Sequence, residues 1–230
     1  MGMAERLDFE SWWADFLEQI RRVDRVEGEY APARLVQSIR ELPSDLRSVF
    51  LDRLLQVALA GGRDAGLALL ALESEAEPRQ CDVIAGHVAR LLAASTGCAG
   101  EEAIAPLLRV LAARQANHYL PLVSRYLHER EICALWTSVA WGLWPAHPAE
   151  FAAAWARYFT SVPAVVWRGT AVVQAFVSRP AALEAVRRGV EERSAGAWAD
   201  LRSALLEESR RPWVSPADRA ALEALAAPAG

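Results

Sequence analysis

The sequence contains no lysine: all 25 of its basic residues are arginines. A lysine amine is required to form a Schiff base with a carbonyl group, and lysines of the P-loop and of protein kinases bind nucleotide phosphates. The absence of lysine therefore excludes pyridoxal-phosphate enzymes, Schiff-base aldolases and the common nucleotide-hydrolysing machines.

Cysteine is also scarce. Cys81, Cys98 and Cys133 are odd in number and far apart in the sequence. This pattern disfavours a disulfide framework and is typical of a reducing compartment. We expect all three to be small residues that pack between helices, since free cysteine is among the most frequently buried residue types.

Long apolar runs are missing as well. The most apolar stretch, residues 132–144, is shorter than the roughly 20 residues that span a bilayer. The first eight residues mix acids with bases and lack the apolar centre of a secretory signal. The sequence therefore predicts a cytoplasmic protein without a membrane partner.

Motifs for catalysis or metal binding are not found in the sequence. There is no Gly-x-Ser-x-Gly elbow and no glycine-rich phosphate loop. His118 and His128 are ten residues apart, whereas two zinc ligands on one helix face are four apart. Cys133 and Glu129 lie nearby and could each bind a metal, but their spacing matches no known set of metal ligands. We expect no catalytic residues, no metal and no cofactor.

The sequence does contain patterns that predict helices. Hydrophobic residues make up 53% of the chain, mostly alanine and leucine, which favour helices and allow close helix packing. From Leu7 to Ala227, apolar residues recur at three- and four-residue steps between breaks at proline, glycine or polar clusters. The predicted fold class is all-α, within a single domain of residues 1–230.

The predicted helices group into about six antiparallel pairs and a C-terminal capping helix. The pairs begin near residues 8, 44, 78, 118, 148 and 180. Among the expected apolar stripes are Val49 and Val83 in the second and third pairs and Val165 in the fifth. A helix is also expected over residues 131–144, directly after the turn that follows residue 128.

The segment Ala103–Leu111 contains a proline inside a helical pattern, and the intervals between pairs are near 34 residues but irregular. Both features resemble HEAT-like repeat proteins, an α-solenoid family of stacked antiparallel helical hairpins. The resemblance implies an extended array with an open flank for binding. An irregular helical bundle is the alternative architecture.

Tryptophan is abundant and supplies most of the candidate contact residues. Nine tryptophans occur, and five of them lie between residues 136 and 167. Trp136 and Trp155 fall on apolar stripes and should be core. Trp141, Trp144 and Trp167 are displaced from these stripes, and Trp167 adjoins Arg168; exposed tryptophan beside arginine is typical of interaction hot spots.

From these features we predict a non-catalytic protein- or peptide-binding adaptor or scaffold, acting as an adaptor, a chaperone-like holder or an inhibitor. Its groove would be lined by tryptophan and arginine. The predicted binding residues are Trp141, Trp144, Trp167, Arg168, Arg109 and Arg202. Arginine suits the role because its planar fork pairs with carboxylates and stacks on aromatic rings.

Two alternatives remain. The size of the chain and its helix pairing resemble those of the HEAT-like DNA glycosylases. This resemblance would imply exposed tryptophans and an aspartate on a basic concave face. Against this, Glu150 is the sole acid in residues 136–167, and residues 1–78 hold 15 acids against 9 arginines, which disfavours nucleic acid. The second alternative is a holder of an apolar small ligand in a tryptophan- and leucine-lined pocket.

Overall fold

The computed structural model describes residues 8–23, 31–114 and 117–226. The first seven residues, on which part of the argument against a secretory signal depends, lie outside the described residues.

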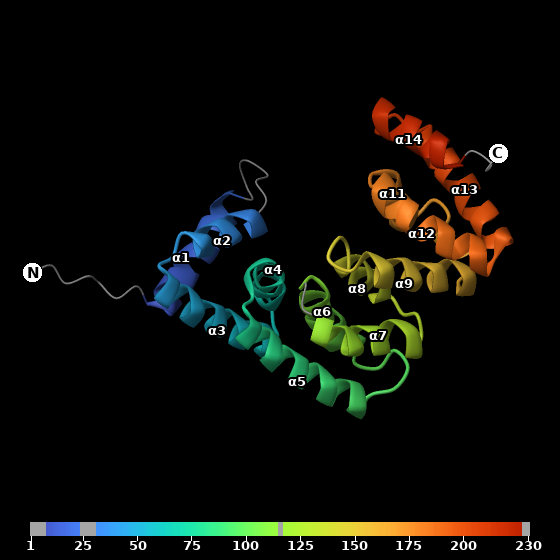
Figure 1. The fold of residues 1–230 in the computed structure, drawn as a ribbon. Coiled ribbons are helices and arrows are strands. Elements are labelled where there is room, and N and C mark those ends of the chain that lie inside the picture. Colours follow the sequence, from blue (N-terminus) through green and yellow to red (C-terminus); the bar gives the residue numbers. More distant parts are fainter. Residues whose placement is uncertain (1–7, 24–30, 115–116, 227–230) are drawn as a thin grey trace, which may run out of the picture. The chain divides into compact units, whose positions relative to one another are not determined.

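Within the described ranges the chain is built from helices, and no β-strand occurs there (Figure 1). The predicted all-α class is confirmed. The helices are α1 (Phe9–Val23), α2 (Ala31–Arg40), α3 (Ser44–Ala60), α4 (Ala65–Glu75), α5 (Pro78–Ala94), α6 (Glu101–Ala112), α7 (Leu120–Glu129), α8 (Trp136–Gly142), α9 (Pro148–Ser161), α10 (Ala164–Trp167), α11 (Ala171–Val177), α12 (Pro180–Arg193), α13 (Ala195–Ser209) and α14 (Pro216–Ala226), with a 3-10 turn at Asn117–Tyr119 before α7.

Proline determines where several helices begin. α5, α9, α12 and α14 each start on a proline, at residues 78, 148, 180 and 216. The first helical position has no intrahelical acceptor for its N–H, so proline, which lacks that group, is tolerated there. These starts fall at or near the predicted ones because the signal is local.

Contacts divide the chain into two compact units, residues 1–86 and residues 87–230, and the division lies within α5. The sequence pattern predicted a single domain of residues 1–230.

The first unit is held together by aromatic rings and small residues. The ring of Phe50 on α3 lies 5.3 Å from that of Phe9 and 5.0 Å from that of Trp12, both on α1. α4 packs against α2 and α3, and Ala68 and Ala71 on α4 are fully buried. Alanine at these positions lets the helix backbones approach closely.

In the second unit, helices that are not neighbours in sequence pack against each other. α6 packs against α8, α9 against α12, and α11 against α13 (Figure 1). The fully buried side chains of this unit include Trp136, Trp155, Phe151 and Phe176, so its core is aromatic, and the prediction that Trp136 and Trp155 are core residues is confirmed.

The predicted helix over residues 131–144 is wrong in its first part, because α8 begins at Trp136. The backbone N–H of Leu135 donates to the Glu101 carboxylate, 2.9 Å away, rather than to a helical carbonyl. Farther along, Gly169 adopts a φ of 67°, a left-handed conformation that favours glycine and separates α10 from α11.

Three valines expected on buried stripes are exposed instead. Val49 is 53% exposed, Val83 50% and Val165 85%. On α3 the buried face is centred on Phe50, Leu51 and Leu54, and Val49 lies at its margin. Burial depends on how each helix is rotated against its neighbours, which the spacing of apolar residues indicates only coarsely.

None of the described helices is both long and apolar enough to cross a membrane.

Candidate functional site

The predicted binding tryptophans surround the aromatic core of the second unit. Trp141, on α8, is half-buried, and its ring lies 4.9 Å from Phe176 and 5.4 Å from Trp155. Trp144 is also half-buried, and its ring lies 5.1 Å from that of Phe151. Both rings therefore pack partly into the core and retain an accessible part.

Trp167 differs from this pair. It is 1% exposed, its Nε1 donates to the Val162 carbonyl at 3.0 Å, and its ring packs edge-on against Phe159 at 5.1 Å. The expectation that Trp167 faces a binding surface is therefore corrected. The short helix α10 turns its valines outward and this indole inward.

Arg168, next in the chain, is exposed and pairs with Asp200 on α13, with 2.9 Å between its Nη2 and the Asp200 Oδ1. Both groups are open to solvent, and such pairs are weak, so a partner carboxylate could displace Asp200. Arg168 nevertheless lies beside a buried tryptophan rather than an exposed one.

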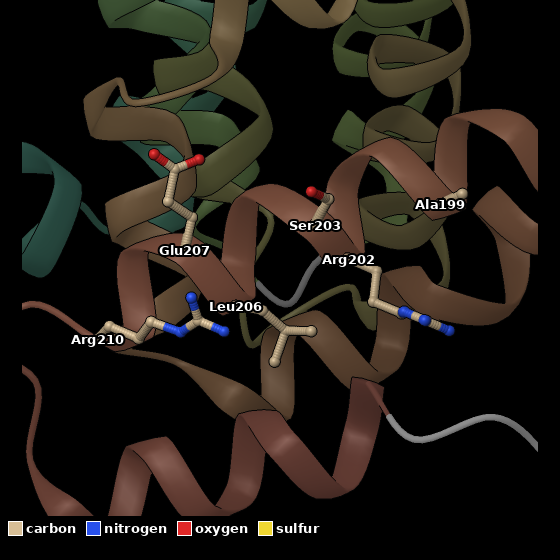
Figure 2. A pocket seen from close by; sticks show the side chains of 6 residues that line it. All are labelled: Ala199, Arg202, Ser203, Leu206, Glu207 and Arg210. Carbon is tan, nitrogen blue, oxygen red and sulfur yellow. The ribbon is translucent and has the colours of Figure 1, made fainter.

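Arg109 and Arg202 lie in different places. Arg109, on α6, packs its side chain against Gly142 of α8, where an added Cβ would be 3.0 Å from the arginine Cγ. Arg202 lies on α13 and lines an open hollow of about 690 Å³ with Ser203, Leu206, Glu207 and Arg210. In Figure 2 the Glu207 carboxylate points away from the Arg210 guanidinium, which extends toward Leu206.

A tryptophan outside the predicted binding set lines another hollow. Trp213, in the connection between α13 and α14, is 51% exposed. It borders an open hollow of about 430 Å³ on α11, together with Ala171, Gln174, Ala175 and Ser178. Trp213 follows Pro212 in a loop and lies on no helical stripe, so apolar periodicity gave no signal for it.

Arg179 connects this hollow with Trp141. Its guanidinium lies 5.1 Å above the Trp141 ring, in the geometry of a cation–π contact. Its Nη1 also donates to the carbonyl of Ala175, a residue that lines the hollow, at 3.3 Å. The term α11 surface is used below for the hollow together with its extension through this arginine: Trp141, Ala171, Gln174, Ala175, Ser178, Arg179 and Trp213.

Hydrogen bonds hold the polar side chains of the α11 surface in place. Gln174 Nε2 donates to a carboxylate oxygen of Glu208 at 3.2 Å, and Glu208 is buried on α13. The Ser178 hydroxyl donates to the carbonyls of Gln174 and Ala175, both at 3.2 Å. The surface thus offers two indoles and a guanidinium on a packed support.

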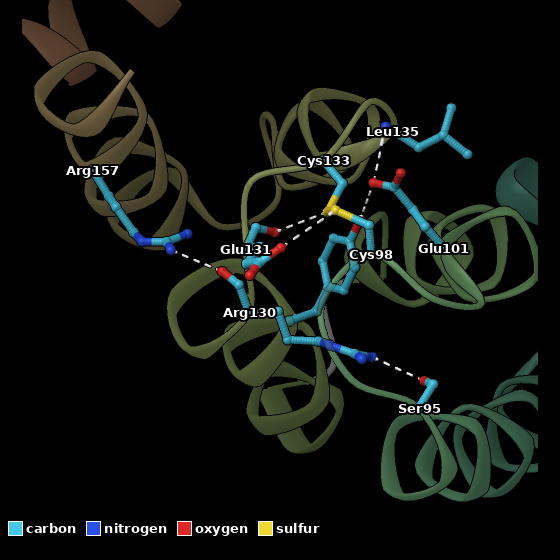
Figure 3. The surroundings of a disulfide bond; sticks show 9 residues. Ser95, Cys98, Glu101, Arg130, Glu131, Cys133, Leu135 and Arg157 are labelled. Carbon is cyan, nitrogen blue, oxygen red and sulfur yellow. Dashed lines mark hydrogen bonds between the residues drawn. A yellow bond between two sulfur atoms is a disulfide. The ribbon is translucent and has the colours of Figure 1, made fainter. Parts of the chain in front are cut away.

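The cysteines correct two expectations. Cys98 and Cys133 form a disulfide between the loop before α6 and the loop before α8, and neither is a buried helix-packing residue (Figure 3). Cys81 is buried, as expected, and takes no part in the disulfide. The spacing of 35 residues gave no sign of the pairing, because the intervening helices α6 and α7 bring the two loops together. The disulfide also removes the cysteine-based argument for a reducing compartment.

His128, one of the two histidines weighed as a metal ligand, is half-buried at the end of α7. Burial lowers its pKa below the ordinary 6.5, and the nearby positive charges of Arg157 and Arg193 lower it further. The cationic neighbours disfavour a metal ion at this histidine.

Comparison with known proteins gives no relative: no protein-family model, curated protein or solved structure matches this chain.

Proposed function

We propose that the protein is a non-catalytic protein- or peptide-binding module, acting as an adaptor, a chaperone-like holder or an inhibitor, and that it binds through the α11 surface. The observation that carries this proposal is the half-exposed indole of Trp213 beside the hollow on α11. Tryptophan and arginine dominate the energetics of protein interfaces, and such residues work best beside a depression that a partner side chain can fill.

The chemistry of the α11 surface favours a particular kind of segment. Ala171 and Ala175 provide an apolar floor, and Arg179 provides a positive charge beside Trp141. An apolar or aromatic side chain followed closely by a carboxylate would fit both parts. The predicted groove is thus revised: Trp141 is retained, and Trp213 and Arg179 are added. The other predicted residues lie outside the α11 surface: Trp144, Trp167, Arg168, Arg109 and Arg202.

We further propose that the helical pairs of the second unit stack in the manner of HEAT-like repeat proteins. Support comes from the second unit, where α7 packs against α9, α9 against α12 and α12 against α14, while α6 packs against α8 and α11 against α13. The first helices of successive pairs, α7, α9 and α12, and the capping helix α14 thus contact one another in turn. Among the second helices, α6 contacts α8 and α11 contacts α13, as expected when antiparallel hairpins stack.

A peptide-library selection on the immobilised full-length protein tests the proposed function. We expect enriched peptides that combine an apolar side chain with an acid. Trp213→Ala should weaken their binding by about 30-fold, equivalent to the ~2 kcal/mol of a hot-spot residue, and Arg179→Ala should weaken it also.

Val49→Ala is the matched control, since Val49 is similarly exposed and apolar but does not line the hollow. Failure to enrich any peptide, or equal binding to the wild type and to Trp213→Ala, contradicts the proposal. Salt-sensitive binding of duplex DNA would favour the glycosylase alternative, and a co-purifying apolar compound would favour the ligand holder.

A further inference from the structure

The loops joined by the disulfide carry a third metal-capable group. The Sγ atoms of Cys98 and Cys133 and a carboxylate oxygen of Glu131 all lie within 4.8 Å of one another. In Figure 3 the Glu131 side chain extends toward the two sulfur atoms, and its Oε2 is 3.8 Å from the Cys98 Sγ. Cys98 and Glu131 are exposed, so ions and small oxidants can reach the group.

We propose that, when the disulfide is reduced, the chain binds one zinc ion through Cys98, Cys133 and Glu131. Two thiolates and a carboxylate form a donor set that zinc accepts, whereas magnesium and calcium require oxygen ligands. Three protein ligands leave the fourth tetrahedral position to water. This site is independent of the α11 surface.

The two loops remain together without the sulfur–sulfur bond, because other contacts hold them. The Glu101 carboxylate accepts the Leu135 N–H at 2.9 Å and the Tyr126 hydroxyl at 2.7 Å, which fixes the loop before α8 to the start of α6. Arg130 Nη1 donates to the Ser95 hydroxyl at 3.2 Å, and Arg157 Nη2 donates to the Arg130 carbonyl at 2.8 Å. These contacts preorganise the thiols after reduction.

The dimensions suit a single ion. The two cysteine Cα atoms are 5.8 Å apart. Tetrahedral zinc with ~2.3 Å bonds to sulfur places two thiolates about 3.8 Å from each other. Rotation of the cysteine side chains supplies that spacing without movement of the backbone, and Glu131 then closes the third side.

Zinc binding and the disulfide exclude each other, since both use the same two sulfur atoms. With a low-molecular-weight disulfide as oxidant, one thiolate attacks an oxidant sulfur and displaces the other sulfur as a thiolate. The second cysteine thiolate then attacks the mixed disulfide, the remaining oxidant thiolate leaves, and zinc is released. Two electrons pass from the cysteines to the oxidant, so bound zinc reports the redox state of the chain.

Cobalt(II), a spectroscopic substitute for zinc, tests the proposal on the full chain after reduction and removal of the reductant. We expect one equivalent to produce a thiolate-to-cobalt charge-transfer band that one equivalent of zinc abolishes. The oxidised wild type should give no band. Cys81→Ser is the matched control and should behave as the reduced wild type, because Cys81 is buried and takes no part in the cluster.

Cys98→Ser and Cys133→Ser should lose the band, and Glu131→Gln should bind at least about tenfold more weakly, a loss that even outer-shell groups of metal sites cause. The serine variants are close in shape to the reduced wild type, and far-ultraviolet circular dichroism verifies that their helices are intact. The proposal is overturned if the folded, reduced wild type gives no band, if the band persists in either serine variant, or if Glu131→Gln binds equally well.

Discussion

At the scale of single residues, the exposed fraction of each tryptophan distinguishes those that support the core from those that could bind a partner. Trp155 is fully buried, and its ring lies within 6.1 Å of six other aromatic rings, whereas Trp213 is half-exposed in a loop. Identical side chains therefore have different consequences when removed.

Trp155→Ala should lower the free energy of unfolding by about 3–5 kcal/mol, because it removes a large core side chain and leaves a cavity. Trp213→Ala should change it by less than about 1 kcal/mol, since the ring is already half-hydrated. Urea denaturation followed by circular dichroism measures both without relying on tryptophan fluorescence. Equal losses would contradict the assigned burial.

Tyr126 should make stability sensitive to alkaline pH. Burial, together with its hydrogen bond to Glu101 and that carboxylate's charge, raises its pKa well above the ordinary 10.0. Below pH 10.0 the hydroxyl is protonated in both folded and unfolded chains, so its contribution is fully present there. As pH rises above 10.0, the unfolded chain loses the proton first, and the free energy of unfolding falls.

Tyr126→Phe should flatten this alkaline decrease in a urea-denaturation series between about pH 9 and pH 11. No lysine amine titrates in that interval. Burial also raises the pKa of Tyr158, so Tyr158 adds its own alkaline decrease and Tyr126→Phe should remove only part of the slope. An equally steep decrease in the variant would contradict the assignment to Tyr126.

At the scale of elements, the helix starts marked by proline were predictable, whereas the margins of the packed faces were not. Proline at residues 78, 148 and 180 marks helix starts by a local rule. Val49 and Val83 satisfied the same helical spacing as their buried neighbours, yet both are exposed. The α8 start was mispredicted because a distant residue, Glu101, takes the Leu135 N–H.

Two helical glycines should respond oppositely to alanine. At Gly86 an added Cβ meets nothing within 4 Å, so Gly86→Ala should stabilise the protein by about 0.5–1 kcal/mol through lower backbone entropy. At Gly142 the same atom would lie 3.0 Å from Arg109 Cγ and 3.2 Å from both Ala112 Cβ and the Arg109 carbonyl oxygen. Gly142→Ala should therefore destabilise by about 1–3 kcal/mol. Thermal denaturation of the pair compares them, and a stabilised Gly142→Ala would contradict the close packing of α6 and α8.

At the scale of the whole molecule, the disulfide links residues 35 apart within the second unit. Reduction in the presence of a chelator should lower the free energy of unfolding by about 3–4 kcal/mol, because the unfolded chain regains the freedom of that loop. Hydrogen exchange should show the loss of protection in α6–α8 and little change in α2–α4. Equal loss throughout both units would contradict a local effect of the disulfide.

The sequence by itself determined the all-helical class, the helix starts marked by proline and the exclusion of lysine-dependent chemistry, because these follow from composition and from interactions between residues a few positions apart. Tertiary structure decided that Trp167 is buried and Trp213 exposed, that Cys98 meets Cys133, and that Arg179 covers Trp141. Those outcomes depend on how each helix is rotated and which loops meet, and both are fixed by contacts between segments distant in the chain.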